Sequence, residues 1–130
     1  MSEREKQALI NTAKKASQNS YSPYSHFAVG AALMAENGEI FAGTNVENIS
    51  FGATVCAERS ALCSAVTAGV KKFKALAVYH EGELAYPCGV CRQMLCEFGD
   101  MDVFLSDGSQ CRELKLSNLI PYNFQTKEIK

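Results

Sequence analysis

The sequence predicts an α/β fold of three layers, α/β/α, in which a five-stranded mixed sheet lies between helices. Three observations support this: a helical pattern near the start of the chain, a hairpin signal after it, and alternating strand and helix patterns in the second half. With 130 residues of ordinary globular composition, we expect a single domain spanning residues 1–130.

The first expected elements are a helix and a hairpin. Ser2 and Glu5 form a capping-box pattern, and apolar residues then recur at helical spacing, which predicts a helix over about residues 3–18. Two apolar runs follow at 27–35 and 39–45, and the Asn-Gly pair between them is a strong signal for a tight hairpin. These two segments should therefore pair antiparallel.

The second half alternates helices and strands. The expected elements are a helix over 56–68, a strand over 73–80, a helix near 88–98, and strands over 103–106 and 110–116. The last two strands are separated only by a short Asp-Gly turn. They should run antiparallel, because a parallel pair needs a crossover of a dozen or more residues.

Charge and composition narrow the classes of partner. The chain carries 13 Lys plus Arg against 14 Asp plus Glu, a formal charge of -1, which disfavours a nucleic-acid or membrane-surface partner. The first residues are charged where a secretory signal would be apolar, and no stretch approaches the length of a membrane span. We therefore expect a cytoplasmic protein whose six cysteines are reduced.

Two short motifs contain the residues best suited to catalysis: Cys56-Ala57-Glu58 and Pro87-Cys88-Gly89-Val90-Cys91. Three thiolates leave one position open on a four-coordinate zinc ion, as in catalytic rather than structural sites. Residues three apart at a helix start can converge on one ion, which suits Cys88 and Cys91. Residues two apart in a helix do not face each other, so we expect Cys56 to be the N-cap residue of its helix, with Glu58 beside the metal.

A cation should accompany such a site. Three thiolates bring the charge of Zn²⁺ and its ligands to a formal -1, which weakens the acidifying effect of the metal. Arg59 lies one turn beyond Cys56, and we expect its guanidinium to donate to the ligand sulfurs and offset their charge.

Simpler interpretations compete for several of these residues. A lone Cys-x-x-Cys also occurs in cores, redox pairs and structural zinc sites, and Glu47 could be a solvated loop carboxylate. Either histidine, His26 or His80, could be a fourth ligand or a base, but neither has ligand spacing, which favours an ordinary structural role. The same applies to the remaining cysteines, which are Cys63, Cys96 and Cys111.

The two motifs match the signature of zinc-dependent nucleobase deaminases, with cysteine in the first ligand position. Three longer stretches, at residues 21–33, 45–48 and 52–59, closely resemble the family of free-nucleoside cytidine deaminases.

This resemblance implies a role for each site residue. Cys56, Cys88 and Cys91 would hold one zinc per subunit, Glu58 would shuttle protons, Asn45 and Glu47 would hold the ribose hydroxyls, Phe27 would pack against the pyrimidine, and Ala57 would offer backbone contact to the base. The branch of the family with three cysteine ligands is homotetrameric, with sites completed by neighbouring subunits, to which Phe124 corresponds. Phe51 stands where the family often has tyrosine.

The expected reaction is hydrolytic deamination of cytidine and deoxycytidine in pyrimidine salvage. Glu58 would take a proton from the attacking water, deliver it to N3, and later protonate the departing amine. Three alternatives remain: a deaminase of another cytosine nucleoside such as blasticidin S, a polynucleotide editor, and a zinc-stabilised scaffold without activity.

Overall fold

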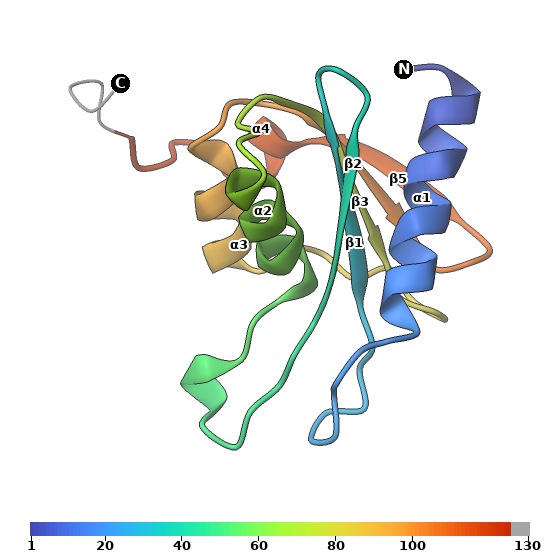
Figure 1. Cartoon of the computed structure of the whole chain (residues 1–130), viewed down its shortest axis with the longest axis vertical. Coiled ribbons are helices and arrows are strands. Elements are labelled where there is room, and N and C mark those ends of the chain that lie inside the picture. Colours follow the sequence, from blue (N-terminus) through green and yellow to red (C-terminus); the bar gives the residue numbers. More distant parts are fainter. Residues whose placement is uncertain (126–130) are drawn as a thin grey trace.

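The computed structural model describes residues 1–125 and contains one sheet with helices on both faces (Figure 1). Its elements in chain order are α1 (Glu3–Ser17), β1 (Gly30–Ala35), β2 (Ile40–Thr44), the 3-10 helix η1 (Phe51–Ala53), α2 (Ala57–Thr67), β3 (Phe73–Tyr79), α3 (Gly89–Cys96), β4 (Asp102–Ser106), β5 (Cys111–Lys115) and α4 (Leu116–Leu119).

The five strands form a mixed sheet in the order β2-β1-β3-β4-β5, so the predicted mixed sheet is present. Strands β1 and β2 form the expected antiparallel hairpin, with Gly38 in the turn at a positive φ of 96°. Strand β1 is also antiparallel to β3, which places Gly30 at the start of β1 opposite Tyr79 at the end of β3. Strands β3 and β4 are parallel, with α3 in the crossover, and β4 and β5 are antiparallel.

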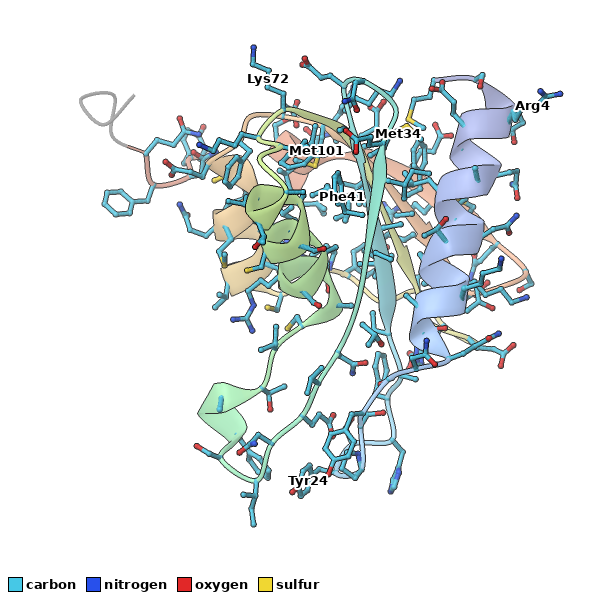
Figure 2. The ribbon with its side chains drawn as sticks, viewed as in Figure 1. Arg4, Tyr24, Met34, Phe41, Lys72 and Met101 are labelled. Carbon is cyan, nitrogen blue, oxygen red and sulfur yellow. The ribbon has the colours of Figure 1, made fainter. Side chains whose placement is uncertain are left out.

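Helix α1 covers one face of the sheet, and α2 and α3 cover the other (Figure 1). The core is correspondingly divided into two clusters of apolar side chains, one on each face. Figure 2 shows Met34 of β1 on the α1 side and Phe41 of β2 on the α2 side. Because successive side chains of a strand point to opposite faces of the sheet, the same strands contribute apolar side chains to both clusters.

Two glycines allow the helices to approach the sheet closely. A Cβ atom at Gly30 would lie 1.8 Å from the carbonyl oxygen of Ala13 in α1. A Cβ atom at Gly43 would lie 2.3 Å from the amide nitrogen of Ala61 in α2. Each face of the sheet therefore has one position where any side chain would collide with helix backbone.

The structure differs from the sequence prediction at several element ends. Strand β1 begins at Gly30 rather than at residue 27. The Asn45 side chain binds the carbonyl oxygen of Phe27 and the amide of Val29, so it takes the place of a partner strand there. Helix α3 ends at Cys96, and the short elements η1 and α4 were not predicted, because such short segments have no periodic pattern. Among residues 1–125, no helix has the length and apolar character needed to cross a bilayer.

Candidate metal centre and active-site pocket

Two of the three cysteines occupy equivalent positions at the starts of α2 and α3. Cys56 is the N-cap residue of α2 with ψ 153°, which confirms the predicted cap, and Cys88 is the N-cap residue of α3 with ψ 168°. The backbone is extended at both positions, so each side chain is directed independently of its helix. Cys91 lies in the first turn of α3 and is buried.

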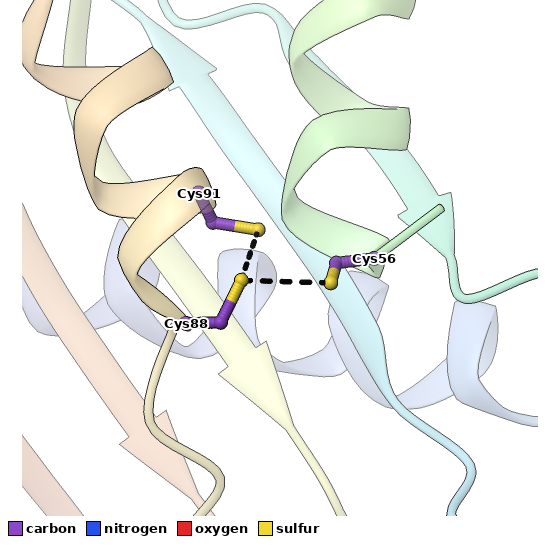
Figure 3. A group of neighbouring side chains, drawn as sticks. All are labelled: Cys56, Cys88 and Cys91. Carbon is purple, nitrogen blue, oxygen red and sulfur yellow. Dashed lines mark hydrogen bonds between the residues drawn. The ribbon is translucent and has the colours of Figure 1, made fainter. Parts of the chain in front are cut away.

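The three sulfurs converge between the two helix starts (Figure 3). The Cys56 and Cys88 Sγ atoms are 3.8 Å apart, and the Cys88 and Cys91 Sγ atoms are 3.6 Å apart. Two sulfurs bound at ~2.3 Å to one tetrahedral zinc ion lie about 3.8 Å from each other, so the spacing fits zinc. Among the described residues, no fourth His, Cys, Asp or Glu atom lies within 4.8 Å of all three sulfurs. The donor set is therefore that of a site with an open position.

Side-chain contacts hold the cysteine-bearing end of α3 in place. The Arg92 guanidinium donates to the carbonyl oxygen of Pro87 at 2.6 Å and to that of Leu119 at 2.7 Å. Because Pro87 directly precedes Cys88, these bonds connect the start of α3 to the C-terminal segment.

Arg59 contacts the cluster as predicted. Its Nη2 atom lies 3.6 Å from Cys56 Sγ and 3.2 Å from the Thr54 carbonyl oxygen. A hydrogen bond from the Cys91 thiol, then one from Arg59, lower the pKa of Cys56 to about 5, while burial opposes them. The same contact with the Cys56 thiolate, together with burial, raises the pKa of Cys91. The environment therefore stabilises negative charge at Cys56.

Glu58 lies in the first turn of α2 and is 5% exposed. Burial, assisted by the Cys56 thiolate, raises the pKa of Glu58 to about 7, and a backbone hydrogen bond and the Arg59 guanidinium oppose this rise. A carboxyl group with a pKa near neutrality can both accept and release a proton at working pH. Glu58 thus has the protonation behaviour of an acid–base group.

A cavity of about 250 Å³ opens beside the metal centre, and its walls include most of the predicted site residues. The cavity is lined by Ser25, Phe27, Val29, Asn45, Glu47, Thr54, Cys56, Ala57, Glu58, Ala85, Tyr86 and Cys88. Such a concave, largely apolar cavity with a few polar groups suits a small organic ligand.

Asn45 and Glu47, two polar residues that line the cavity, are fixed by the loop that follows α1. Asn45 is 9% exposed, and its Oδ1 atom accepts hydrogen bonds from Ser20 and Val29. The Glu47 carboxylate accepts the backbone amides of Tyr24 and Ser25 and also the Ser25 hydroxyl. These bonds lower the pKa of Glu47, the Ser25 hydroxyl contributing most. Glu47 is therefore a positioned, ionised acceptor at neutral pH.

Two predicted substrate contacts lie outside this cavity in the single chain. Phe51 is 73% exposed in η1 and packs edge-on against Tyr24. Phe124 is 80% exposed, although Gln93 donates to its backbone carbonyl oxygen. Neither ring lines the cavity formed by the described residues.

Both histidines lie outside the sulfur cluster. His26 is exposed in the loop after α1, at a positive φ of 59°. His80 follows β3 and stacks against Phe27. The remaining cysteines are free thiols; Cys96 is buried, and Cys63 and Cys111 are exposed.

Some lining residues were not predicted from the sequence, and Tyr86 is the largest of them. Tyr86 directly precedes Pro87, so its place beside the motif was the available signal. Its hydroxyl accepts a hydrogen bond from Arg112 of β5. This contact joins distant segments, so no local sequence pattern predicts it.

Comparisons with known proteins agree with this geometry. A family profile described as the cytidine and deoxycytidylate deaminase zinc-binding region matches residues 3–107. A cytidine deaminase of Sporosarcina psychrophila is 45% identical over 125 residues, covering 93% of this chain and 92% of that protein. The crystal structure of cytidine deaminase from Burkholderia pseudomallei has a TM-score of 0.87 and 42% identity, covering 95% of this chain and all of that one (100%).

A blasticidin-S deaminase of Bacillus cereus is also similar, with 31% identity over 106 residues that cover 74% of this chain and 76% of that protein. The family profile covers strands β1 to β4, the three cysteines and Glu58 together. By profile, sequence and structure, the chain belongs to the cytidine and deoxycytidylate deaminase family.

Proposed function

We propose that this protein catalyses the hydrolytic deamination of cytidine and 2′-deoxycytidine to uridine and 2′-deoxyuridine, with release of ammonia, in pyrimidine salvage. The observation that carries the proposal is the convergence of three cysteine sulfurs at zinc spacing beside a buried glutamate in a small cavity. A scaffold site would not require either the open position or the adjacent carboxyl group.

Cys56, Cys88 and Cys91 hold one zinc ion per subunit in this proposal. When bound there, zinc supplies a Lewis acid that lowers the pKa of a coordinated water. Glu58 takes one proton of the attacking water and delivers it to N3 of the pyrimidine. It then takes the second proton from the hydroxyl now bonded to C4 and passes it to the amine, so that the bond between C4 and the amine nitrogen breaks and ammonia leaves. Arg59 donates to Cys56 Sγ and offsets the negative charge of the three ligands.

The rest of the cavity positions the nucleoside. Phe27 packs against the pyrimidine, and the backbone of Ala57 contacts its polar edge. The Glu47 carboxylate retains acceptor capacity, and the Asn45 amide nitrogen retains a second hydrogen beyond its bond to Phe27. These groups suit the hydroxyls of a ribose, because a ligand without hydroxyls would leave them unpaired.

The charge of the cavity favours a nucleoside over a nucleotide. Its carboxyl side chains are the ionised Glu47 and Glu58, whose pKa is about 7, and no Lys or Arg is among the residues that line it in the described chain. A phosphate group would be placed near Glu47 without a cation to pair with it. The same charge argues against a polynucleotide as substrate.

The exposed aromatic rings support an assembly with shared active sites. Phe51 and Phe124 are among the most exposed large apolar side chains of the described chain. We include in the proposal a single-domain protein that forms a cytoplasmic homotetramer, in which these rings cover the cavity of a neighbouring subunit. Light scattering of the purified protein gives the mass of the assembly directly, and a monomer would contradict this part.

Blasticidin S is the second candidate substrate, because the chain is 31% identical to a blasticidin-S deaminase. The two substrates share the cytosine ring and differ in the sugar. The positioned carboxylate of Glu47 and amide of Asn45 favour the ribose of cytidine.

The test is an absorbance assay with the zinc-loaded full-length protein, using cytidine, deoxycytidine, deoxycytidine monophosphate and blasticidin S as separate substrates. We expect loss of the cytosine absorbance with the two nucleosides. Glu58→Gln should retain zinc and lower kcat on the order of 10²–10⁴-fold. The exposed Glu36→Gln in the hairpin turn is the matched control and should keep full activity. A zinc-loaded wild type that converts none of the substrates would identify the chain as a scaffold.

A further inference from the structure

The aromatic wall of the cavity has a second layer. The imidazole of His80 stacks on the Phe27 ring, with the ring centroids 3.6 Å apart and the planes 9° from parallel. Phe27 lines the cavity, whereas His80 is not among its lining residues. One face of the Phe27 ring is therefore covered by His80, and only the other remains for a ligand.

The sheet topology brings these two residues together. Phe27 lies just before β1 and His80 just after β3, and these strands are antiparallel, with Gly30 opposite Tyr79. The His80 amide also donates to the carbonyl oxygen of Ser106 at the end of β4. His80 is thus fixed at the end of the central strand β3, while Phe27 belongs to the loop that precedes β1.

A hydrogen bond sets the plane of the imidazole. Nδ1 of His80 lies 2.7 Å from the carbonyl oxygen of Ala28. A carbonyl oxygen only accepts, so Nδ1 carries the hydrogen and donates. His80 therefore binds the loop at two adjacent points, the ring of Phe27 and the backbone of Ala28.

The backbone of Phe27 is held separately by the polar residues of the cavity. Its amide donates to the Ser25 hydroxyl, and its carbonyl oxygen accepts from Asn45. These bonds fix where the side chain begins but leave the ring free to rotate. The stack with His80 restricts the ring on the side away from the cavity.

We propose that His80 is a positioning residue for the substrate base: it holds the Phe27 ring in the orientation against which the pyrimidine packs. This inference rests on the proposed function, in which Phe27 contacts the cytosine. The stack lies behind the base rather than at the reacting carbon, so it contributes equally to the ground state and the transition state. Its loss should raise KM and leave kcat nearly unchanged.

Three substitutions separate the two contacts. His80→Ala removes both, His80→Phe keeps a flat ring without the donor, and His80→Asn keeps a donor near the Nδ1 position without the ring. Since aromatic stacking is the contact that touches Phe27, we expect KM for cytidine to rise about three- to tenfold in His80→Ala. His80→Asn should be nearly as impaired, and His80→Phe should recover most of the wild-type KM.

A double-mutant cycle tests whether the effect passes through Phe27. In a Phe27→Leu background, His80→Ala should cause less than about a twofold further rise in KM, because the ring that it positions is absent. Glu81→Ala, the exposed neighbour of His80, is the control and should change neither constant. Zinc content and Tm are measured for every variant, and if His80→Ala does not fold, His80→Phe and His80→Asn decide the question.

The outcomes distinguish the two proposals. An inactive zinc-loaded wild type overturns the deaminase assignment and this inference with it. An active wild type whose KM stays within twofold in His80→Ala and His80→Asn overturns the role of His80 alone. A fall in kcat together with loss of zinc in His80→Ala overturns the role of His80 as well. So does a rise in KM on His80→Ala that is as large in the Phe27→Leu background as in the wild type.

Discussion

The helices on the two faces of the sheet begin in the same conformation but with different chemistry. Ser2, the N-cap residue of α1, has φ -74° and ψ 158°, and Cys56, the N-cap residue of α2, has φ -74° and ψ 153°. The Ser2 hydroxyl accepts the amide of Glu5, whereas the sulfurs of Cys56 and Cys88 make no such bond to their helices. On the α1 face the cap position stabilises the helix, and on the other face it directs a sulfur that we propose as a zinc ligand.

This difference explains why the cysteine site forms where it does. The first-turn amides of α2 and α3 carry partial positive charge that no side-chain cap satisfies. A cysteine at either cap position places its sulfur next to that charge, which suits a ligand that carries negative charge. In the proposed zinc site, Cys56 and Cys88 would therefore serve metal binding at a cost to the local stability of their helices.

The largest expected effect on zinc binding and activity comes from replacing a cysteine cap with a serine cap. In Cys88→Ser, the new hydroxyl is a good N-cap group, so the Tm of the metal-free protein should equal or exceed that of the metal-free wild type. Serine is a poor zinc ligand, so zinc retention and kcat/KM should fall more than the ~10–100-fold seen when groups behind a ligand are lost. Zinc content, Tm and cytidine turnover are measured together.

The exposed Cys63 of α2 provides the control for this substitution, and Cys63→Ser should keep zinc and activity. Retention of stoichiometric zinc by Cys88→Ser would contradict the assignment of Cys88 as a ligand.

A smaller effect is expected at Arg59, which donates to a ligand without being one. Arg59→Ala removes the cation beside Cys56 Sγ, so zinc release to a chelator should accelerate, or turnover should fall, by ~10–100-fold. Arg59→Lys keeps the charge but not the planar donor, and should be intermediate. An Arg59→Ala protein that matches the wild type in both measurements would remove Arg59 from the mechanism.

Gly30 and Gly43, which lie against the backbones of α1 and α2, give a matched pair of substitutions. Gly43→Ala forces a Cβ against the Ala61 amide and displaces α2, which carries Cys56 and Glu58. Gly30→Ala forces a Cβ against Ala13 and displaces α1, which carries no site residue. Both should lower the free energy of unfolding by about 1–3 kcal/mol or more. Only Gly43→Ala should also lower kcat/KM of the folded, zinc-loaded fraction, by about tenfold.

Urea titrations and zinc analysis of each glycine variant separate these effects. Equal losses of kcat/KM in the folded fractions would show that the site depends on both faces of the sheet alike.

The features predictable from sequence are those that local spacing determines. The Asn-Gly pair predicted the hairpin, and the two-residue separation of Cys56 and Glu58 predicted the cap. The bonds of Asn45 to the segment before β1, and the stack of His80 on Phe27, join residues from 16 to 53 positions apart and leave no local pattern. The exposed positions of Phe51 and Phe124 likewise follow from tertiary structure, which spacing does not encode.

The smallest effect is expected at the cap that has only a structural task. Ser2→Ala removes the acceptor for the Glu5 amide and opens the capping box, which should lower the free energy of unfolding by about 1 kcal/mol. Ser2→Asp keeps an acceptor at the same position and should retain most of the stability. Because α1 lies across the sheet from the cysteines, kcat, KM and zinc content should equal the wild-type values in both variants. A change in zinc affinity in Ser2→Ala would show that the start of α1 is coupled through the sheet to the starts of α2 and α3. If they are independent, α2 and α3 can have cysteine at their cap positions while the cap of α1 stabilises its own helix.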